Sequence, residues 1–241
     1  MWFSLNILTS FITNEYRPSL PKPEFVTLPS NKTALVIVDM QNDFSHPEGS
    51  IFIGNMIGHT IPKIKYLLDK SRTEGLKILH TQSWHPEDAP RYMDPPVPRA
   101  SFGSNGCKVN TWGADIIKEL KPLKGEPIIQ KDTFDPWFGT KMEQILVSNN
   151  FGEFEHDSAQ RNRLRHESYV IITGTASDVC VDKAVIGFFF RGYKVIIPID
   201  CISTYDQFCQ ESAIYRFVNY FDAIITKSEM IQFVPETTQG K

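Results

Sequence analysis

The stretch from Tyr169 to Lys183 constrains the fold more than any other part of this 241-residue chain. Residues 169–173 form an apolar run rich in β-branched side chains, which is typical of a buried strand, and Gly174 ends the run. From Val181 onward the apolar residues recur at spacings of three and four, which predicts an amphipathic helix. Cys180 therefore stands where a strand turns into a helix. In open α/β sheets such junctions line the edge where ligands bind.

Cys180 has two interpretations at this point. A thiol at a helix N-terminus lies near the positive end of the helix dipole, which favours the thiolate and makes Cys180 a candidate nucleophile. Most free cysteines are instead small buried apolar side chains. The stretch by itself leaves both open.

The rest of the chain alternates strand and helix patterns. Short apolar runs predict six strands, at residues 34–38, 76–80, 125–130, 169–173, 194–199 and 223–226. Helical spacing predicts helices between them. This alternation predicts an α/β fold of three layers, α/β/α, with a mainly parallel six-stranded sheet. Because residues 13–31 hold four prolines and no period, we expect residues 1–31 to be an N-terminal extension and residues 32–241 to be the domain.

Composition and charge exclude several function classes. The chain has 25 basic and 28 acidic residues and a formal net charge of -3, so nothing predicts binding to nucleic acid or to an anionic membrane. Its four cysteines include no C-x-x-C pair, which argues against a disulfide framework and a structural zinc site and favours the cytoplasm. The apolar residues 1–12 are too short to span a bilayer, so we expect them to pack on the domain or on a neighbouring subunit.

Three ionisable side chains stand at the ends of three predicted strands: Asp39, Lys131 and Cys180. In a parallel sheet these ends share one edge. A carboxylate can take the thiol proton and return it to a leaving nitrogen, and an ammonium stabilises both anions. The turn after Gly174 offers backbone N–H groups to an oxyanion. Taken singly, Asp39 is an ordinary turn or N-cap residue and Lys131 an ordinary solvated lysine.

Two motifs and one lysine resemble a known family. Val38-Asp-Met-Gln-Asn-Asp-Phe44, Lys131 and Gly174-Thr-Ala-Ser-Asp-Val-Cys-Val181 look like the isochorismatase-like cysteine hydrolases. That family includes nicotinamidases, N-carbamoylsarcosine and ureidoacrylate amidohydrolases, and biuret hydrolase. The resemblance runs from about Thr33 to about Met230 and implies a Rossmann-like parallel sheet in a homo-oligomer, which we expect to be a dimer or tetramer.

The resemblance also implies roles for particular residues. Asp39, Lys131 and Cys180 match the catalytic triad of the family. A cis peptide bond is expected between Thr175 and Ala176, with the backbone N–H groups of Ala176 and Cys180 as oxyanion donors. The implied enzyme is a cysteine amidohydrolase that cleaves the C–N bond of a small amide through a Cys-linked acyl intermediate, releases ammonia or an amine, and uses no cofactor. Isochorismatases proper lack the cysteine.

Two branches of the family remain possible. Residues 112–131 resemble the carbamoyl and ureido branch, which we take as the main interpretation. The alternative is a nicotinamidase, a type that holds a metal through an Asp-x-His motif and a further histidine. The corresponding stretch here has Ser83 in place of the aspartate, and serine is a poor ligand for divalent metals. We therefore expect no metal, with His85 as the remaining candidate ligand against an ordinary loop histidine.

Substrate contacts are expected from the long stretch 81–113, because loops of this length in compact domains usually carry function. Phe44, Trp84 and Phe138 are candidate pocket walls, although aromatic residues near strand ends are often plain core. Arg91 is the candidate partner of a substrate carboxylate, with the neighbouring Arg99 and Lys108, against the alternative of solvated loop charges.

Two hypotheses of other classes stay open. One is a non-catalytic relative that binds a small molecule or a partner through residues 1–31 and the polar insertion Phe151–Glu167. The other is a redox-active thiol protein with a disulfide between Cys180 and Cys201.

Overall fold

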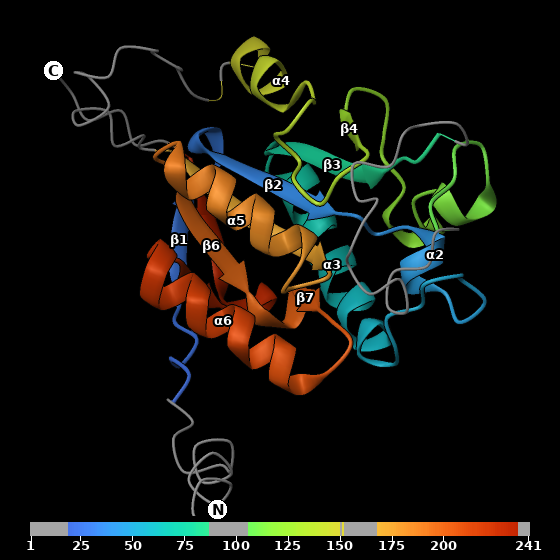
Figure 1. The fold of residues 1–241 in the computed structure, drawn as a ribbon. Coiled ribbons are helices and arrows are strands. Elements are labelled where there is room, and N and C mark those ends of the chain that lie inside the picture. Colours follow the sequence, from blue (N-terminus) through green and yellow to red (C-terminus); the bar gives the residue numbers. More distant parts are fainter. Residues whose placement is uncertain (1–18, 87–105, 150, 152–167, 236–241) are drawn as a thin grey trace, which may run out of the picture.

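A computed structural model gives the structure of the chain and describes residues 19–86, 106–149, 151 and 168–235. Its centre is one sheet of seven parallel strands (Figure 1). The main path has the order β4-β3-β2-β5-β6-β8, and the short β7 pairs with the end of β5. The strands are β2 (Thr33–Val38), β3 (Lys77–Ser83), β4 (Ile128–Lys131), β5 (Tyr169–Thr175), β6 (Lys194–Pro198), β7 (Ile202–Ser203) and β8 (Ile224–Thr226). The six strands of the main path are the six that the sequence predicts.

Helices cover both faces of this sheet, so the predicted three-layer α/β/α fold is confirmed (Figure 1). They are α2 (Asn42–Ser45), α3 (Met56–Thr73), α4 (Met142–Ser148), α5 (Cys180–Phe190) and α6 (Gln207–Phe221). Single 3-10 turns are η1 (Ser30–Lys32), η2 (Trp112–Ala114), η3 (Lys118–Leu120), η4 (Ile199–Cys201) and η5 (Ser228–Met230). Among the described residues, no helix is long and apolar enough to cross a membrane.

The alternation along β2 explains why the domain has two cores. Ala34, Val36 and Val38 belong to the core that α4, α5 and α6 cover, whereas Leu35 and Ile37 belong to the core that α3 covers. Every residue of β2 is buried, because the strand lies in the middle of the sheet with a helix layer on each face. Each fully buried aliphatic side chain contributes roughly 1.5–3 kcal/mol of hydrophobic stabilisation.

A second, two-stranded sheet was not predicted. β1 (Val26–Pro29) pairs in parallel with β9 (Ile231–Val234), and its apolar side chains join the core on the α3 side. The pairing joins residues about two hundred positions apart, so no local pattern announces it. The division of the chain at residue 31 stays a prediction.

β3 is longer than the sequence predicts. The expected strand ends at His80, but β3 continues through Thr81 and Gln82 to Ser83, where it pairs with β4 up to Lys131. The prediction that the loop begins at Thr81 is therefore wrong. Polar residues continue the strand because hydrogen bonds at its carboxyl end satisfy their side chains.

Candidate active site

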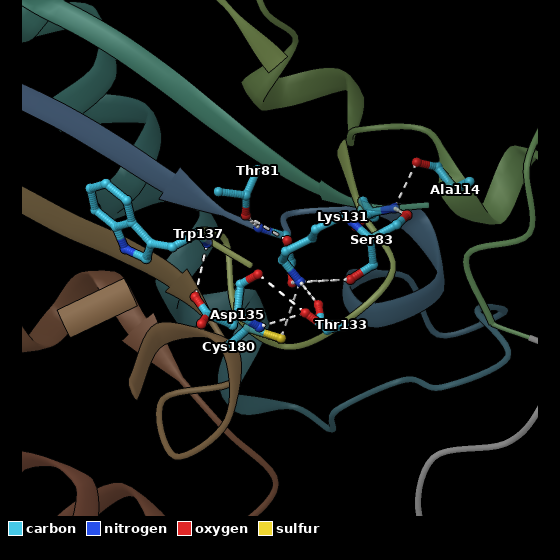
Figure 2. A network of polar contacts seen from close by, with 10 residues as sticks. Thr81, Ser83, Ala114, Lys131, Thr133, Asp135, Trp137 and Cys180 are labelled. Atoms are coloured by element: carbon cyan, nitrogen blue, oxygen red, sulfur yellow. Dashed lines mark hydrogen bonds and ion pairs between the residues drawn. The ribbon is translucent and has the colours of Figure 1, made fainter. Parts of the chain in front are cut away.

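Four neighbouring strands bring their carboxyl ends together at one edge of the sheet. Asp39 directly follows β2, Ser83 ends β3, and Lys131 ends β4. Cys180 is the first residue of α5, five positions after β5 ends. The order β4-β3-β2-β5 places these strands side by side, so residues far apart in the sequence meet here. The structure thus brings the three predicted ionisable side chains into one cluster, in which Figure 2 labels Lys131 and Cys180.

Lys131 is the centre of the cluster (Figure 2). Its Nζ lies 2.6 Å from Oδ2 of Asp39, and both side chains are fully buried. The same nitrogen donates to Oγ of Ser83 at 3.1 Å, to the carbonyl oxygen of Thr133 at 3.0 Å and to Sγ of Cys180 at 3.5 Å. An ammonium has three hydrogens, so these four acceptors saturate it.

Two hydroxyl groups of β3 orient the Asp39 carboxylate. Thr81 donates to Oδ1 at 2.6 Å and accepts from the Asp39 backbone N–H at 3.1 Å. Ser83 donates to Oδ2 at 3.1 Å. Both carboxylate oxygens therefore accept hydrogen bonds from β3, which fixes the orientation of the carboxylate. Asp39 has a φ of 50°, a left-handed conformation that a non-glycine residue adopts at a cost of about 1–3 kcal/mol and that is frequent at functional sites.

The side chain of Gln41 fixes the end of β3. Its Oε1 accepts from the Ser83 N–H at 2.7 Å, and its Nε2 donates to the Ser83 carbonyl oxygen at 2.8 Å. This amide therefore pairs with the strand end as a neighbouring strand would. Nε2 also donates to the carbonyl oxygen of Ala114, which ties η2 to the site. The result is a rigid seat for the Ser83 hydroxyl.

Gly174 allows β5 to approach β2 closely. Its φ is 111°, and a Cβ at this position would lie 2.1 Å from the carbonyl oxygen of Val38. Only glycine can satisfy both conditions. The peptide bond between Thr175 and Ala176 is cis. After it, the chain turns into α5 and delivers Cys180 to the cluster.

The turn before Cys180 is pinned by internal hydrogen bonds. Ser177 donates its backbone N–H to the Ser203 carbonyl oxygen at 3.0 Å and its hydroxyl to Oε1 of Gln210 at 2.7 Å. In the described part of the chain, the N–H groups of Ala176 and Cys180 donate to no backbone acceptor. Two N–H groups beside a nucleophile are suited to an oxyanion.

Burial and neighbouring charges set the ionisation of the site. Burial lowers the pKa of Lys131, but the Asp39 carboxylate and the Cys180 sulfur outweigh it, so the net pKa is raised and the side chain stays cationic. Burial also raises the pKa of Cys180; Lys131 lowers that pKa and Asp39 raises it. The net pKa of Cys180 is raised, which favours the neutral thiol, because burial outweighs the ammonium next to it.

The predicted pocket residues have different surroundings. Phe44 packs against the core on the α3 side. Trp84 is half-buried beside β4, where its backbone N–H donates to the Lys131 carbonyl oxygen at 2.7 Å. Phe138 is 53% exposed. Arg91 and Arg99 lie outside the described residues. The roles of all these residues and of Lys108 in substrate binding stay predictions.

Sequence reasoning missed the residues that hold the cluster together, namely Thr81, Ser83, Thr133 and Gln41. Thr81 and Ser83 continue the period of two from Leu79, and extending this alternation past His80 would have found them. Thr133 acts through its backbone carbonyl, for which the sequence has no signal.

The described residues do not fit the metal site of nicotinamidases. The Ser83 hydroxyl, which stands at the expected aspartate position, is used by Asp39 and Lys131. Within the described ranges, no group of three or more His, Cys, Asp or Glu side chains is arranged to hold a metal ion.

A disulfide between Cys180 and Cys201 does not fit the fold. All four cysteines are free. Cys180 belongs to the core under α5 and α6, whereas Cys201 belongs to the core under α3. The sheet separates the two thiols, which argues against the redox hypothesis.

Comparison with known proteins identifies the family. A family model described as Isochorismatase domain matches residues 33–229. The chain belongs to the isochorismatase family. This membership confirms the resemblance carried by the motifs around Asp39 and Cys180.

Individual members of the isochorismatase family resemble the chain over most of its length. Ureidoacrylate amidohydrolase RutB of Serratia proteamaculans is 23% identical over 221 residues, which cover 83% of this chain and 82% of the relative. An isochorismatase family protein of Desulfovibrio vulgaris is 25% identical with a TM-score of 0.68, covering 82% of this chain and 95% of that protein. Nicotinamidase/pyrazinamidase of Bacillus subtilis has a TM-score of 0.67 at 18% identity, covering 81% and 100%. The last likeness shows the fold alone.

Proposed function

We propose that this protein is a cysteine amidohydrolase that cleaves the C–N bond of a small carbamoyl or ureido compound. The observation that carries the proposal is the Lys131 ammonium, which contacts both the Asp39 carboxylate and the Cys180 sulfur in a buried site. A binding module has no need of this set of nucleophile, base and cation. The similarity to a ureidoacrylate amidohydrolase over 83% of the chain supports the substrate class.

The first half of the reaction forms an acyl-enzyme. Because the resting Cys180 is a thiol, its proton passes to Asp39 as Sγ attacks the carbonyl carbon. The N–H groups of Ala176 and Cys180 stabilise the negative charge that develops on the carbonyl oxygen. Asp39 then gives the proton to the departing nitrogen, the C–N bond breaks, and ammonia or an amine leaves.

The second half of the reaction releases the acid. Asp39, again a carboxylate, takes a proton from a water molecule that attacks the thioester carbon. The C–S bond breaks, and the proton returns to Cys180 as the thiol forms again. Lys131 stays cationic throughout, because its raised pKa keeps it protonated, and it balances the charge on Asp39 and on sulfur.

Product analysis tests the proposal. Ammonia release is measured with N-carbamoyl amino acids, ureidoacrylate, biuret and nicotinamide, with wild type beside Cys180→Ala. We expect a Cys180-dependent signal on a ureido or carbamoyl compound. A signal on nicotinamide alone would overturn the substrate class and favour the nicotinamidase alternative. Full activity of Cys180→Ala would overturn the cysteine mechanism, and silence of wild type on every compound would favour a non-catalytic binding protein.

We also propose that the protein works in the cytoplasm as a homo-oligomer of two or four copies. Four free cysteines suit a reducing compartment. Phe190 and Tyr220, at the ends of α5 and α6, are 74% and 62% exposed, which suits a surface that another copy covers. Light scattering coupled to gel filtration measures the mass in solution, and a monomer at micromolar concentration would contradict the oligomer.

A further inference from the structure

The segment that follows Lys131 returns to the helix that carries Cys180. Residue Trp137 lies in the connection between β4 and α4, and its ring packs on α5. It meets the Phe188 ring in a T-shaped contact with centroids 4.8 Å apart. The Arg191 guanidinium carbon lies 3.8 Å from the centroid of the indole. A cation over an indole face is a favourable contact, so both Phe188 and Arg191 help to hold the ring.

The Trp137 ring packs directly against Gly187. A Cβ at Gly187 would lie 2.0 Å from Nε1 of Trp137 and 2.2 Å from its Cδ1, which is too close for any real contact. Gly187 stands inside α5, where glycine is a poorer helix former than alanine. The close approach of the indole gives the physical reason for a glycine at this position.

A short chain of hydrogen bonds leads from Trp137 back to the ammonium of Lys131 (Figure 2). The backbone N–H of Trp137 donates to Oδ1 of Asp135 at 2.8 Å. The Asp135 backbone N–H donates to Oγ1 of Thr133, and this hydroxyl donates to the Asp135 carbonyl oxygen, both at 3.2 Å. The Thr133 carbonyl oxygen then accepts from Nζ of Lys131 at 3.0 Å. The turn is thus a compact unit with the indole at one end and the lysine acceptor at the other.

We propose that Trp137 is a positioning residue: by packing on Gly187 it fixes the Thr133 carbonyl, which holds the Lys131 ammonium between Asp39 and Cys180. The inference rests on the proposed function. Cys180, the nucleophile, is the first residue of α5. Gly187, against which the indole packs, lies seven residues later, about 10 Å along the helix axis. A contact remote from the chemistry therefore sets where the ammonium stands relative to the sulfur.

Gly187→Ala tests this inference, because the added methyl group must displace the indole. The expected result is a fall in kcat of about tenfold to a hundredfold, with KM changed far less, since the misplaced group acts on the reacting atoms. The matched control is Gly58→Ala in α3, an exposed helical glycine with no atom within 4 Å of the added Cβ. The control is expected to keep the wild-type kcat. Equal kcat values in both variants would overturn the inference.

A double-mutant cycle separates positioning from a local effect on the helix. Trp137→Leu removes the ring that the new methyl group would strike. If Gly187 acts through Trp137, Gly187→Ala has no further effect on kcat in the Trp137→Leu background. If the kcat loss of the double variant equals the product of the two single losses, Gly187 acts independently of Trp137, which would overturn the inference. If Gly187→Ala does not fold, Trp137→Leu and Trp137→Phe test the same point, and wild-type kcat in both would overturn it.

The reactivity of the Cys180 thiol gives a readout that needs no substrate. Among the described residues, four ionisable groups face this thiol: Lys131 and Asp39 in direct contact, and Cys107 and Tyr205 further away. The ammonium favours the thiolate. Moving it away should slow alkylation of Cys180 by iodoacetamide and shift the pH profile of the rate upward, as peptide mass mapping would show.

The two kinds of failure are distinguishable in this design. An unchanged alkylation profile in Gly187→Ala and Trp137→Leu would overturn the positioning role, whatever the substrate is. If the two variants shift the alkylation profile but the wild-type protein hydrolyses no amide, the positioning role is supported and the proposed function fails.

Discussion

The ammonium of Lys131 and the carboxylate of Asp39 are 2.6 Å apart, and water reaches neither side chain. Two buried charges of this kind are each stabilised by the other, because removal of either one leaves an uncompensated charge in a medium of low polarity. The same ammonium touches Cys180 at 3.5 Å. Stability and chemistry therefore depend on one pair of residues.

Lys131→Met leaves the Asp39 carboxylate buried without its cation. We expect the free energy of unfolding to fall by about 3–5 kcal/mol, measured by urea denaturation. The double variant Asp39→Asn with Lys131→Met removes both charges and is expected to lose less stability than Lys131→Met alone. A double variant less stable than either single variant would contradict this account of the pair. Both single variants, Lys131→Met and Asp39→Asn, and the double variant are expected to be inactive.

Thr81→Val removes the hydroxyl that donates to Asp39 at 2.6 Å. We expect kcat to fall by roughly tenfold or more, because the base loses its orientation, and stability to fall by about 1–3 kcal/mol. The matched control is Thr173→Val on β5, an equally buried threonine whose hydroxyl donates to the Val36 carbonyl oxygen at 3.2 Å. The control is expected to lose similar stability and to keep kcat. Equal kcat losses in both variants would argue against a specific role for Thr81.

The rate of Cys180 alkylation is expected to rise only well above the pH at which an ordinary thiol reacts, because burial raises the pKa of this group. Lys131→Met should move the profile to still higher pH, since the ammonium lowers the pKa. Asp39→Asn should move it to lower pH, since the carboxylate raises the pKa. A wild-type rate at pH 7 as fast as that of free cysteine would show that the site holds a thiolate.

His80 makes stability depend on pH. Burial lowers its pKa to about 4, against partial compensation by Glu126, whose Oε2 lies 3.4 Å from its Nε2. Between pH 4 and 6.5 the unfolded chain binds a proton that the folded chain does not. Stability should therefore fall as pH drops below 6.5, by up to about 3 kcal/mol in all.

Urea unfolding between pH 5 and 7.5 measures the contribution of His80. Apart from the 3.4 Å contact between Nε2 and Glu126, the ring nitrogens have no polar partner among the described residues, so His80→Leu should fold and should flatten the pH dependence. The control His59→Leu, at an exposed position of α3, should leave the slope unchanged. An unchanged slope in His80→Leu would assign the dependence to other groups.

Much of the fold was predictable because local patterns of apolar residues mark its main strands and helices. β2 and β5 are continuous apolar runs, and the amphipathic spacing of α5 shows which face it buries. β1 and β9 were not predictable, since each is short and becomes a strand only through its partner at the other end of the chain. The carboxyl end of β3 was missed because its side chains are polar, although hydrogen bonds satisfy them.

The sequence by itself determined which ionisable residues stand at strand ends, and a parallel sheet leaves few places for such residues to meet. Only the tertiary structure decided how they meet. Contacts between strands and loops set the four acceptors around Lys131, the hydroxyl groups on Asp39 and the seat of Trp137 on Gly187. The protonation of Cys180 also belongs to the tertiary structure, because a thiol is desolvated only when the domain closes around it, and here that burial outweighs the charge next to it.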